Sequence, residues 1–326
     1  MYAIVAIVLS VIYGIAIGTN DAANSFGDWI GAKVGKVRVG LTLCGVFALL
    51  GAVLEGGKVV KTIGGGIVPK MYLTPEIAIV GVLAAMLWVF MASSLGFPIS
   101  TTHSVVGGVG GIGLGLVLFG KMSSSEFNLK VVKNIIICWL STPTGAALMG
   151  FVFAYIVLYV IRKGKIHRSA TTFSKVLLTI SSSYVAYTWG TNDVANSVAL
   201  VAGSGIVSSK MACVIGGVSI AVGAIVFGKK VAETVGFKIA NINPITGVCA
   251  DLACAFTIHI FTNLKMPVST THALVGAIAG VSFARGINIV NFKMLRDIIF
   301  AWILTPVICC IITFLLFLFF HWTGVM

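Results

Sequence analysis

The sequence has little charge and very few acidic residues. Of its 326 residues, 10% are charged, and 9 Asp and Glu stand against 22 Lys and Arg. Soluble domains carry about 25% charged residues, so this composition excludes an ordinary soluble domain. With 58% hydrophobic residues and a mean hydropathy of +1.08, the chain is predicted to cross a lipid bilayer several times as helices.

Cysteines with metal-type spacing and the features expected of a signal peptide are also missing. The 7 cysteines lie in or beside apolar runs, without the CxxC spacing of a zinc site. The first apolar run lacks a basic leader and a small-residue cleavage site, so it is expected to remain as a helix. The net charge of +13 lies in short loops, where basic residues orient membrane helices. No nucleic-acid partner is therefore expected.

Two nearly identical octets reveal an internal repeat. GTNDAANS at 18–25 and GTNDVANS at 190–197 differ only at Ala22 and Val194. Three further landmarks recur in the same order: 51–64 matches 223–236, FPISTTHSVVG at 97–107 matches MPVSTTHALVG at 266–276, and WLSTP at 139–143 matches WILTP at 302–306. This order indicates a tandem duplication.

Each copy contains about five apolar segments. They lie near 1–18, 39–54, 77–95, 98–119 and 134–161, and near 176–190, 211–228, 247–264, 268–284 and 297–320. An odd number of crossings places the second copy upside down, as in secondary transporters. We predict an all-α polytopic membrane protein with two inverted-topology repeats, 1–161 and 176–326, joined by a basic linker at 162–175. Broken helices or re-entrant hairpins are expected at the site, and the STTH segments either span the membrane or re-enter it.

Loop charges predict the orientation. If the N-terminus lies outside, 14 of the 22 Lys and Arg fall in inner loops and 8 outside, in agreement with the positive-inside rule. The protein is therefore expected in the cell membrane, with both termini outside and the central linker in the cytoplasm.

The octets are candidate cation sites. An Asp in mid-bilayer costs about 2.5–3.5 kcal/mol, so it needs a compensating function. On a helix, Asn20, Asp21 and Asn24 share one face, and Gly18 with Asn20 is expected to break the helix and free backbone carbonyls. Such oxygens suit a hard monovalent cation, although either polar residue could instead cap a helix. The corresponding second-copy residues are Asn192, Asp193 and Asn196.

The two STTH segments are candidate anion sites. A proline followed by Ser-Thr-Thr predicts a helix start with free backbone N–H groups, which bind oxyanions. The alternative is ordinary capping and back-bonding by the hydroxyls. The candidate anion ligands are Ser100, Thr101, Thr102, Ser269, Thr270 and Thr271.

Several other polar residues accompany these motifs. His103 and His272 follow the hydroxyls directly and either donate to the anion or brace the hairpin. Glu55 and Asp28 have no acidic counterpart in the other copy, so neither is included in the predicted site. Lys58 lies at a segment end and is expected to reach the membrane interface.

The paired octets and the paired P-x-S-T-T-H segments resemble the inorganic phosphate transporter (PiT) family over nearly the whole chain. The resemblance implies a homodimeric, cation-coupled importer of inorganic phosphate. It implies phosphate between the STTH segments and Na⁺ at two sites, one formed by Asp21 and Asn24, the other by Asp193 and Asn196.

The chain departs from the family pattern GANDVANxxG at several positions. Thr19 and Thr191 replace the usual Ala and add a hydroxyl near each cation site, while Val198-Ala199 stands where a glycine is usual. These changes leave the ion and the substrate open, because relatives of this fold also carry sulfate. The short central linker indicates a compact prokaryotic member, since eukaryotic members carry a large loop there.

The predicted function is secondary active import of phosphate by alternating access, coupled to Na⁺ or, as the runner-up, to H⁺. No cofactor other than the coupling ion is expected. A sulfate or general oxyanion symporter and, less favoured, an anion channel remain as alternatives. An enzyme is not expected, because Ser, His and Asp occur in symmetric duplicate rather than in one asymmetric catalytic arrangement.

Overall fold

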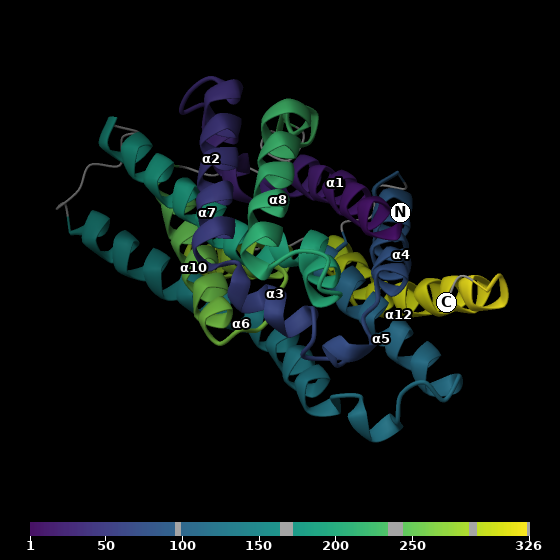
Figure 1. The fold of residues 1–326 in the computed structure, drawn as a ribbon. Helices are drawn as coiled ribbons and strands as arrows, with labels where there is room; N and C mark the ends of the chain where they lie inside the picture. Colours follow the sequence, from purple (N-terminus) through teal and green to yellow (C-terminus); the bar gives the residue numbers. More distant parts are fainter. Residues whose placement is uncertain (95–98, 164–171, 234–243, 287–291, 325–326) are drawn as a thin grey trace.

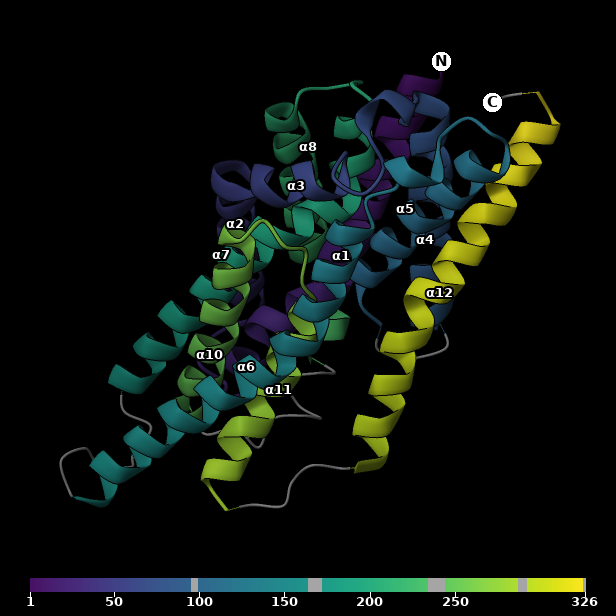
Figure 2. The same ribbon diagram turned by 90° about the horizontal axis from the view of Figure 1, so that it is seen from below.

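The computed structural model describes residues 1–94, 99–163, 172–233, 244–286 and 292–324, and the regular elements within them are all helices. Figures 1 and 2 show the bundle from two directions. The first copy contains α1 (Tyr2–Gly31), α2 (Val37–Glu55), α3 (Gly57–Ile63), α4 (Pro75–Ser94), α5 (Thr101–Leu118) and α6 (Leu129–Arg162). The second contains α7 (Thr172–Gly203), α8 (Ser209–Val222), a π-helical turn (Gly223–Phe227), α10 (Pro244–Asn263), α11 (Thr270–Ala284) and α12 (Phe292–Trp322).

Eight of the described helices are long and apolar enough to cross a membrane, judged by length and composition. They belong to α1, α2, α4, α5, α6, α8 with its π-helical turn, α10 and α12. The prediction of an all-α polytopic membrane protein is therefore confirmed. Most of the predicted linker, 164–171, lies outside the described residues.

The predicted helix break at the octets is wrong. Both α1 and α7 run through their octets without interruption, which also excludes helix capping by the octet residues. A Cβ at Gly18 would lie 2.0 Å from the carbonyl oxygen of Ile220, and one at Gly190 would lie 2.0 Å from that of Ala48. These glycines thus permit close helix packing rather than a break.

The helices α5 and α11 begin within the STTH motifs, at buried positions inside the molecule. Ser100 Oγ accepts the backbone N–H of His103 at the start of α5, and Ser269 Oγ accepts that of His272 at the start of α11, both at 3.3 Å. The predicted helix starts are therefore confirmed. Figure 2 shows α5 beside α12 and α11 beside α6.

The last helix of each copy holds the STTH helix of the other. A Cβ at Gly107 of α5 would lie 2.3 Å from the carbonyl oxygen of Pro306 in α12. The matching Cβ at Gly276 of α11 would lie 2.2 Å from that of Pro143 in α6. The two copies are thus interlocked through equivalent backbone contacts, which fix where α5 and α11 begin.

Candidate functional site

Each STTH helix is hydrogen-bonded to the aspartate of its own copy. Thr101 Oγ1 donates to Asp21 Oδ2 at 3.3 Å, and Thr270 Oγ1 donates to Asp193 Oδ2 at 3.2 Å. The exposed fractions of the two aspartates are 3% and 0%. Because neither carboxylate forms an ion pair with any residue that the structure describes, the hydroxyls supply polar contacts that offset their burial. Asn20 Nδ2 also donates to Asp21 Oδ1 at 3.1 Å.

The octet asparagines contact the STTH helix of the opposite copy. Asn24 Nδ2 donates to Thr271 Oγ1 at 3.3 Å. Asn196 Nδ2 donates to the hydroxyls of Thr101 and Thr102, both at 3.1 Å. The structure therefore brings the predicted cation and anion residues into one cluster, in which residues from both copies surround each helix start.

Three further polar residues of the octets, Asn192, Thr19 and Thr191, form hydrogen bonds with nearby backbone carbonyls or with the octet aspartate. With its amide oriented to satisfy both atoms, Asn192 donates to Asp193 Oδ1 at 3.2 Å and to the carbonyl of Val268 at 3.0 Å. Thr19 Oγ1 donates to the carbonyl of Ile15 at 2.8 Å, and Thr191 Oγ1 donates to that of Thr188 at 2.6 Å. The hydroxyl protons of both threonines are thus used within their own helices.

The two histidines meet between the STTH helices. His103 Nδ1 lies 3.0 Å from the carbonyl oxygen of Trp302, and His272 Nδ1 lies 3.5 Å from that of Trp139. Since a carbonyl only accepts, the proton of each neutral ring belongs on Nδ1. The ring of His103 lies 3.7 Å from that of Trp139, and His272 lies 3.4 Å from Trp302. These contacts hold both rings between the copies.

The centre of the molecule therefore offers two kinds of ligand. The starts of α5 and α11 carry backbone N–H groups with partial positive charge, and hydroxyls lie beside them. Asp21, Asp193 and the octet amides supply oxygens a few ångströms away. Such a cluster can hold an oxyanion and monovalent cations next to each other.

Asp251 and Glu55 are acidic residues that lie outside this cluster. Asp251 accepts from Ser181 Oγ at 2.8 Å and from Ser182 Oγ at 2.7 Å, and its exposed fraction is 1%. Repeat comparison missed it because that method finds only residues present in both copies. Glu55, at the end of α2, instead pairs with Lys58 at the start of α3 and accepts a hydrogen bond from Tyr187 of α7.

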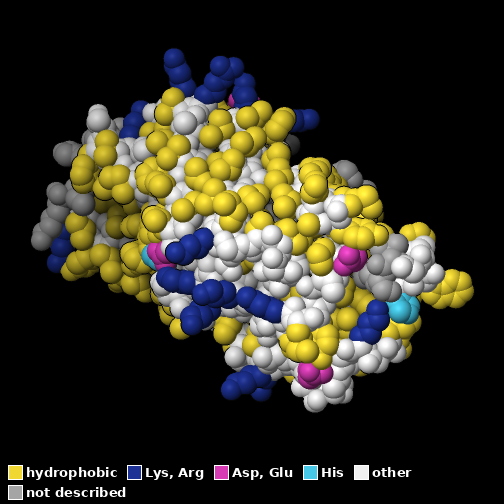
Figure 3. Space-filling view, in the orientation of Figure 1, with side chains coloured by type: hydrophobic (Ala, Val, Ile, Leu, Met, Phe, Trp, Pro, Cys, Tyr) yellow, Lys and Arg dark blue, Asp and Glu magenta, His cyan; other side chains and the backbone are white. Residues whose placement is uncertain are grey.

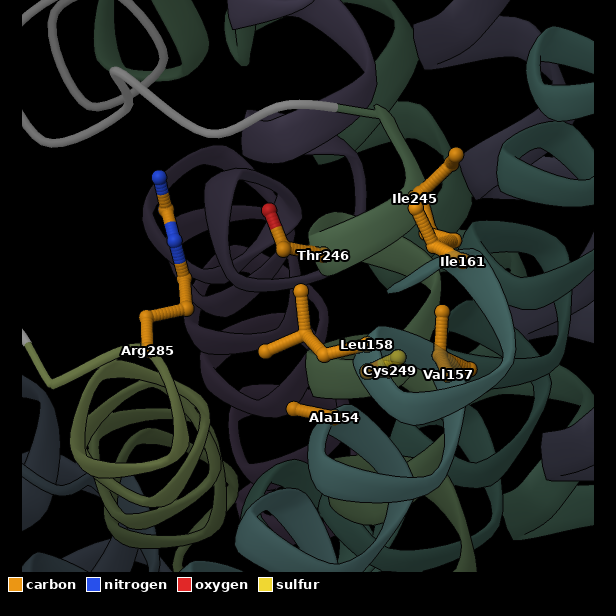
Figure 4. A pocket seen from close by; sticks show the side chains of 8 residues that line it. All are labelled: Ala154, Val157, Leu158, Ile161, Ile245, Thr246, Cys249 and Arg285. Atoms are coloured by element: carbon orange, nitrogen blue, oxygen red, sulfur yellow. The ribbon is translucent and has the colours of Figure 1, made fainter. Parts of the chain in front are cut away.

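A cavity of about 360 Å³ opens elsewhere, between α6, α10 and the end of α11. Figure 4 shows apolar side chains such as Leu158 along it, with Arg285 and Thr246 at its edge. It contains none of the octet or STTH residues, so it is separate from the central cluster.

Comparison with known proteins identifies the family of this chain. Residues 17–313 match the sequence profile of the phosphate transporter family. A protein of Pyrococcus furiosus named "Putative phosphate permease PF1020" is 30% identical, with 93% of this chain and 92% of that protein covered. The Bacillus subtilis sulfate permease CysP is 32% identical, with coverage of 95% and 86%.

A solved structure shows the same fold. The sodium-dependent phosphate transporter superposes with a TM-score of 0.84 at 28% identity, covering 98% of this chain and 99% of that one. The resemblance inferred from the motifs is thus confirmed, as is the prediction that the protein is a transporter rather than an enzyme. On the profile match across residues 17–313, the chain belongs to the phosphate transporter family.

Proposed function

We propose that this protein imports inorganic phosphate together with Na⁺ by alternating access. The central observation is that α5 and α11 begin inside the molecule, each bonded to the aspartate of its own copy and the asparagine of the other. One ligand set thus draws on both copies, as expected for a substrate site at the interface of inverted repeats.

Phosphate would lie between the starts of α5 and α11. Helix N-termini and hydroxyls bind tetrahedral oxyanions, and we assign this contact to Ser100, Thr101, Thr102, Ser269, Thr270 and Thr271. Near neutral pH inorganic phosphate keeps an O–H, because it is a triprotic acid and its second ionisation, with a pKa of about 6–7, still leaves one proton on the dianion. The carboxylate of Asp21 or Asp193 can accept a hydrogen bond from that O–H. Sulfate, in contrast, would present only oxygen lone pairs to these carboxylates.

Each octet would bind one Na⁺. We assign the first site to Asp21 and Asn24 with Asn20, and the second to Asp193 and Asn196 with Asn192. Neutral amide oxygens are ligands that a proton relay does not need, and the similar solved transporter is described as sodium-dependent. Thr19 and Thr191 belong to the octets and support the cation sites from within their own helices. His103 and His272 stabilise the starts of α5 and α11.

Two sites match the electrical requirement of import. Moving one charge across 100 mV is worth about 2.3 kcal/mol, so an inside-negative potential opposes a dianion by about 4.6 kcal/mol at that voltage. Two Na⁺ cancel this cost, and a third would make import electrogenic.

Alternating access follows from the arrangement of the copies. We infer that residues 1–161 and 176–326 are inverted repeats, and that α5 and α11 are the inner halves of re-entrant hairpins because both begin at the centre and pack on opposite end helices. The proposed assembly is a homodimer in the cell membrane, with both termini outside and the 162–175 linker in the cytoplasm.

Uptake of labelled phosphate into proteoliposomes tests this function. A Na⁺ gradient should drive uptake, whereas a proton gradient without Na⁺ should not. Equal uptake under a proton gradient alone would replace Na⁺ by H⁺ as the coupling ion. Counterflow of phosphate should also be observed, because a channel cannot exchange labelled for unlabelled substrate against a gradient.

A sulfate symporter is the second candidate, because the sulfate permease of Bacillus subtilis is 32% identical. The deciding measurement is competition at neutral pH, in which a large excess of sulfate should barely slow phosphate uptake. If sulfate competes on equal terms, the carboxylates do not read the phosphate proton and the substrate is oxyanions in general.

A further inference from the structure

Four lysines gather around α3, away from the central site. Lys58 and Lys61 lie one turn apart on α3. Lys58 Nζ donates to Asn263 Oδ1 at 2.6 Å, which brings Lys265 close, and Thr62 Oγ1 donates to the carbonyl of Lys265 at 2.6 Å. The stem of Lys70 lies against Gly65, where an added Cβ would be 2.5 Å from it. We call Lys58, Lys61, Lys70 and Lys265 the lysine patch.

Lys61, Lys70 and Lys265 are exposed and Lys58 is partly buried, and few ion pairs neutralise the patch. Figure 3 shows Lys and Arg side chains in a row across this face, where Figure 1 places α3. Glu55 pairs with Lys58, whereas Lys61, Lys70 and Lys265 form no ion pair with any residue that the structure describes. Among the described residues, an ion pair therefore neutralises one of the four ammonium groups.

The patch is connected directly to the STTH segment of the second copy. From Lys265 the chain reaches Ser269, the cap of α11, in four residues. The intervening carbonyls are held by site residues: Thr102 Oγ1 donates to that of Val268 at 3.0 Å, and Trp139 Nε1 to that of Pro267 at 3.2 Å. The lysine patch thus lies at the surface end of a short segment whose other end is the proposed phosphate site.

The lysine patch does not lie where lysines that orient membrane helices are expected. Basic residues concentrate in cytoplasmic loops, yet in the proposed orientation these four are half of the eight Lys and Arg outside. Orientation signals therefore do not explain them. A basic surface next to an anion site attracts anions by long-range electrostatics and raises their rate of association.

We propose that the lysine patch is an outer binding station that captures the phosphate dianion before it enters the central site. This inference rests on the proposed import of phosphate. The ammonium groups bind the anion loosely and in a salt-dependent way, so that it is concentrated at the segment leading to α11 without being held there.

Uptake kinetics in intact cells test whether the lysine patch captures phosphate. The double variant Lys61→Gln/Lys265→Gln should raise the KM for phosphate about three- to tenfold at low ionic strength and leave the maximal rate unchanged. Raising the ionic strength with choline chloride should bring variant and wild type together, because salt screens exposed charges. An unchanged KM, or a fall in maximal rate alone, would overturn the proposal.

Control variants distinguish electrostatic capture of phosphate from other effects of the substitutions. Lys61→Arg/Lys265→Arg keeps the charge and should behave as wild type, and Lys121→Gln/Lys130→Gln removes equal charge elsewhere and should do the same. Efflux from preloaded cells should be unaffected by Lys61→Gln/Lys265→Gln; an effect on efflux alone would place the patch at the exit and refute capture.

Lipid headgroups are the other source of phosphate oxyanions. In proteoliposomes of phosphatidylcholine alone, the KM change should persist; if it requires phosphatidylglycerol, the patch binds lipid and the proposal fails. Failure of the wild type to take up phosphate would instead refute the proposed function, which the same assay shows independently of the variants.

Discussion

The same eight-letter motif lies in two different environments in the two copies. Residues 190–197 of the second octet are all buried, whereas Thr19, Asn20 and Asn24 of the first are partly exposed. Their partners differ in the same way, since Thr102 is buried and Thr271 is partly exposed. Inverted repeats in unequal conformations generate one-sided access to a shared site. In the alternating-access cycle proposed above, this difference in burial would correspond to one state, with access along the first octet.

Away from the centre the copies differ in chemistry as well as exposure. Tyr187 donates to Glu55 at 2.6 Å, and Lys58 pairs with the same carboxylate. At the position of Glu55 the second copy has Phe227. Close packing and the site are duplicated, whereas this polar network occurs once.

The largest effect is expected from the two aspartates. Asp21→Asn and Asp193→Asn should each reduce phosphate uptake to the level of protein-free vesicles, because both carboxylates belong to the proposed shared site. Glu126→Gln, which removes a surface charge, is the control and should retain uptake. If either aspartate variant transports at the wild-type rate, the two octets are not functionally equivalent.

Thiol labelling tests the difference in exposure. In detergent, Asn24→Cys should react with a hydrophilic maleimide about tenfold faster than Asn196→Cys, because access to a thiol controls its reaction. Wild type provides the background, since six of its seven cysteines are buried. Equal rates would mean that both octets are equally accessible in solution.

Backbone packing should be equally sensitive in both copies. Gly107→Ala and Gly276→Ala each place a Cβ within 2.3 Å of a proline carbonyl, and overpacking of this kind costs about 1–3 kcal/mol. Thermal unfolding should show similar decreases in Tm. Gly110→Ala is the control on α5, because its Cβ would have no neighbour nearer than 3.9 Å. A decrease in one copy alone would contradict equivalent packing.

The smallest effect is expected from the network that occurs once. Tyr187→Phe removes the hydroxyl that donates to Glu55, at a cost of about 1.5 kcal/mol, the lower end of the range for hydrogen bonds to charged groups, because the carboxylate is partly exposed. The Tm should fall slightly while phosphate uptake persists. Tyr184→Phe, which removes the hydrogen bond to His259, is the matched variant and should behave alike. Complete loss of uptake in Tyr187→Phe would show that this network is part of transport.

The sequence alone determined the membrane class, the duplication and the two motif pairs. Hydropathy follows directly from composition, and a repeat preserves residue order whatever the fold. The helix starts at Thr101 and Thr270 were also predictable, because Ser and Pro signal them locally. Orientation of the chain remains a prediction, as do the roles of the site residues.

Only the tertiary structure decided the course of α1 and α7 and the exchange of partners between copies. Gly18 and Asn20 suggested a broken helix, but close contact with α8 uses the glycine and keeps the helix whole. Local sequence cannot reveal that Asn24 bonds to Thr271, 247 residues away. Nor does local sequence show that the two octets, which differ at a single residue, are exposed to different extents. Their exposure depends on the helices that are packed around them.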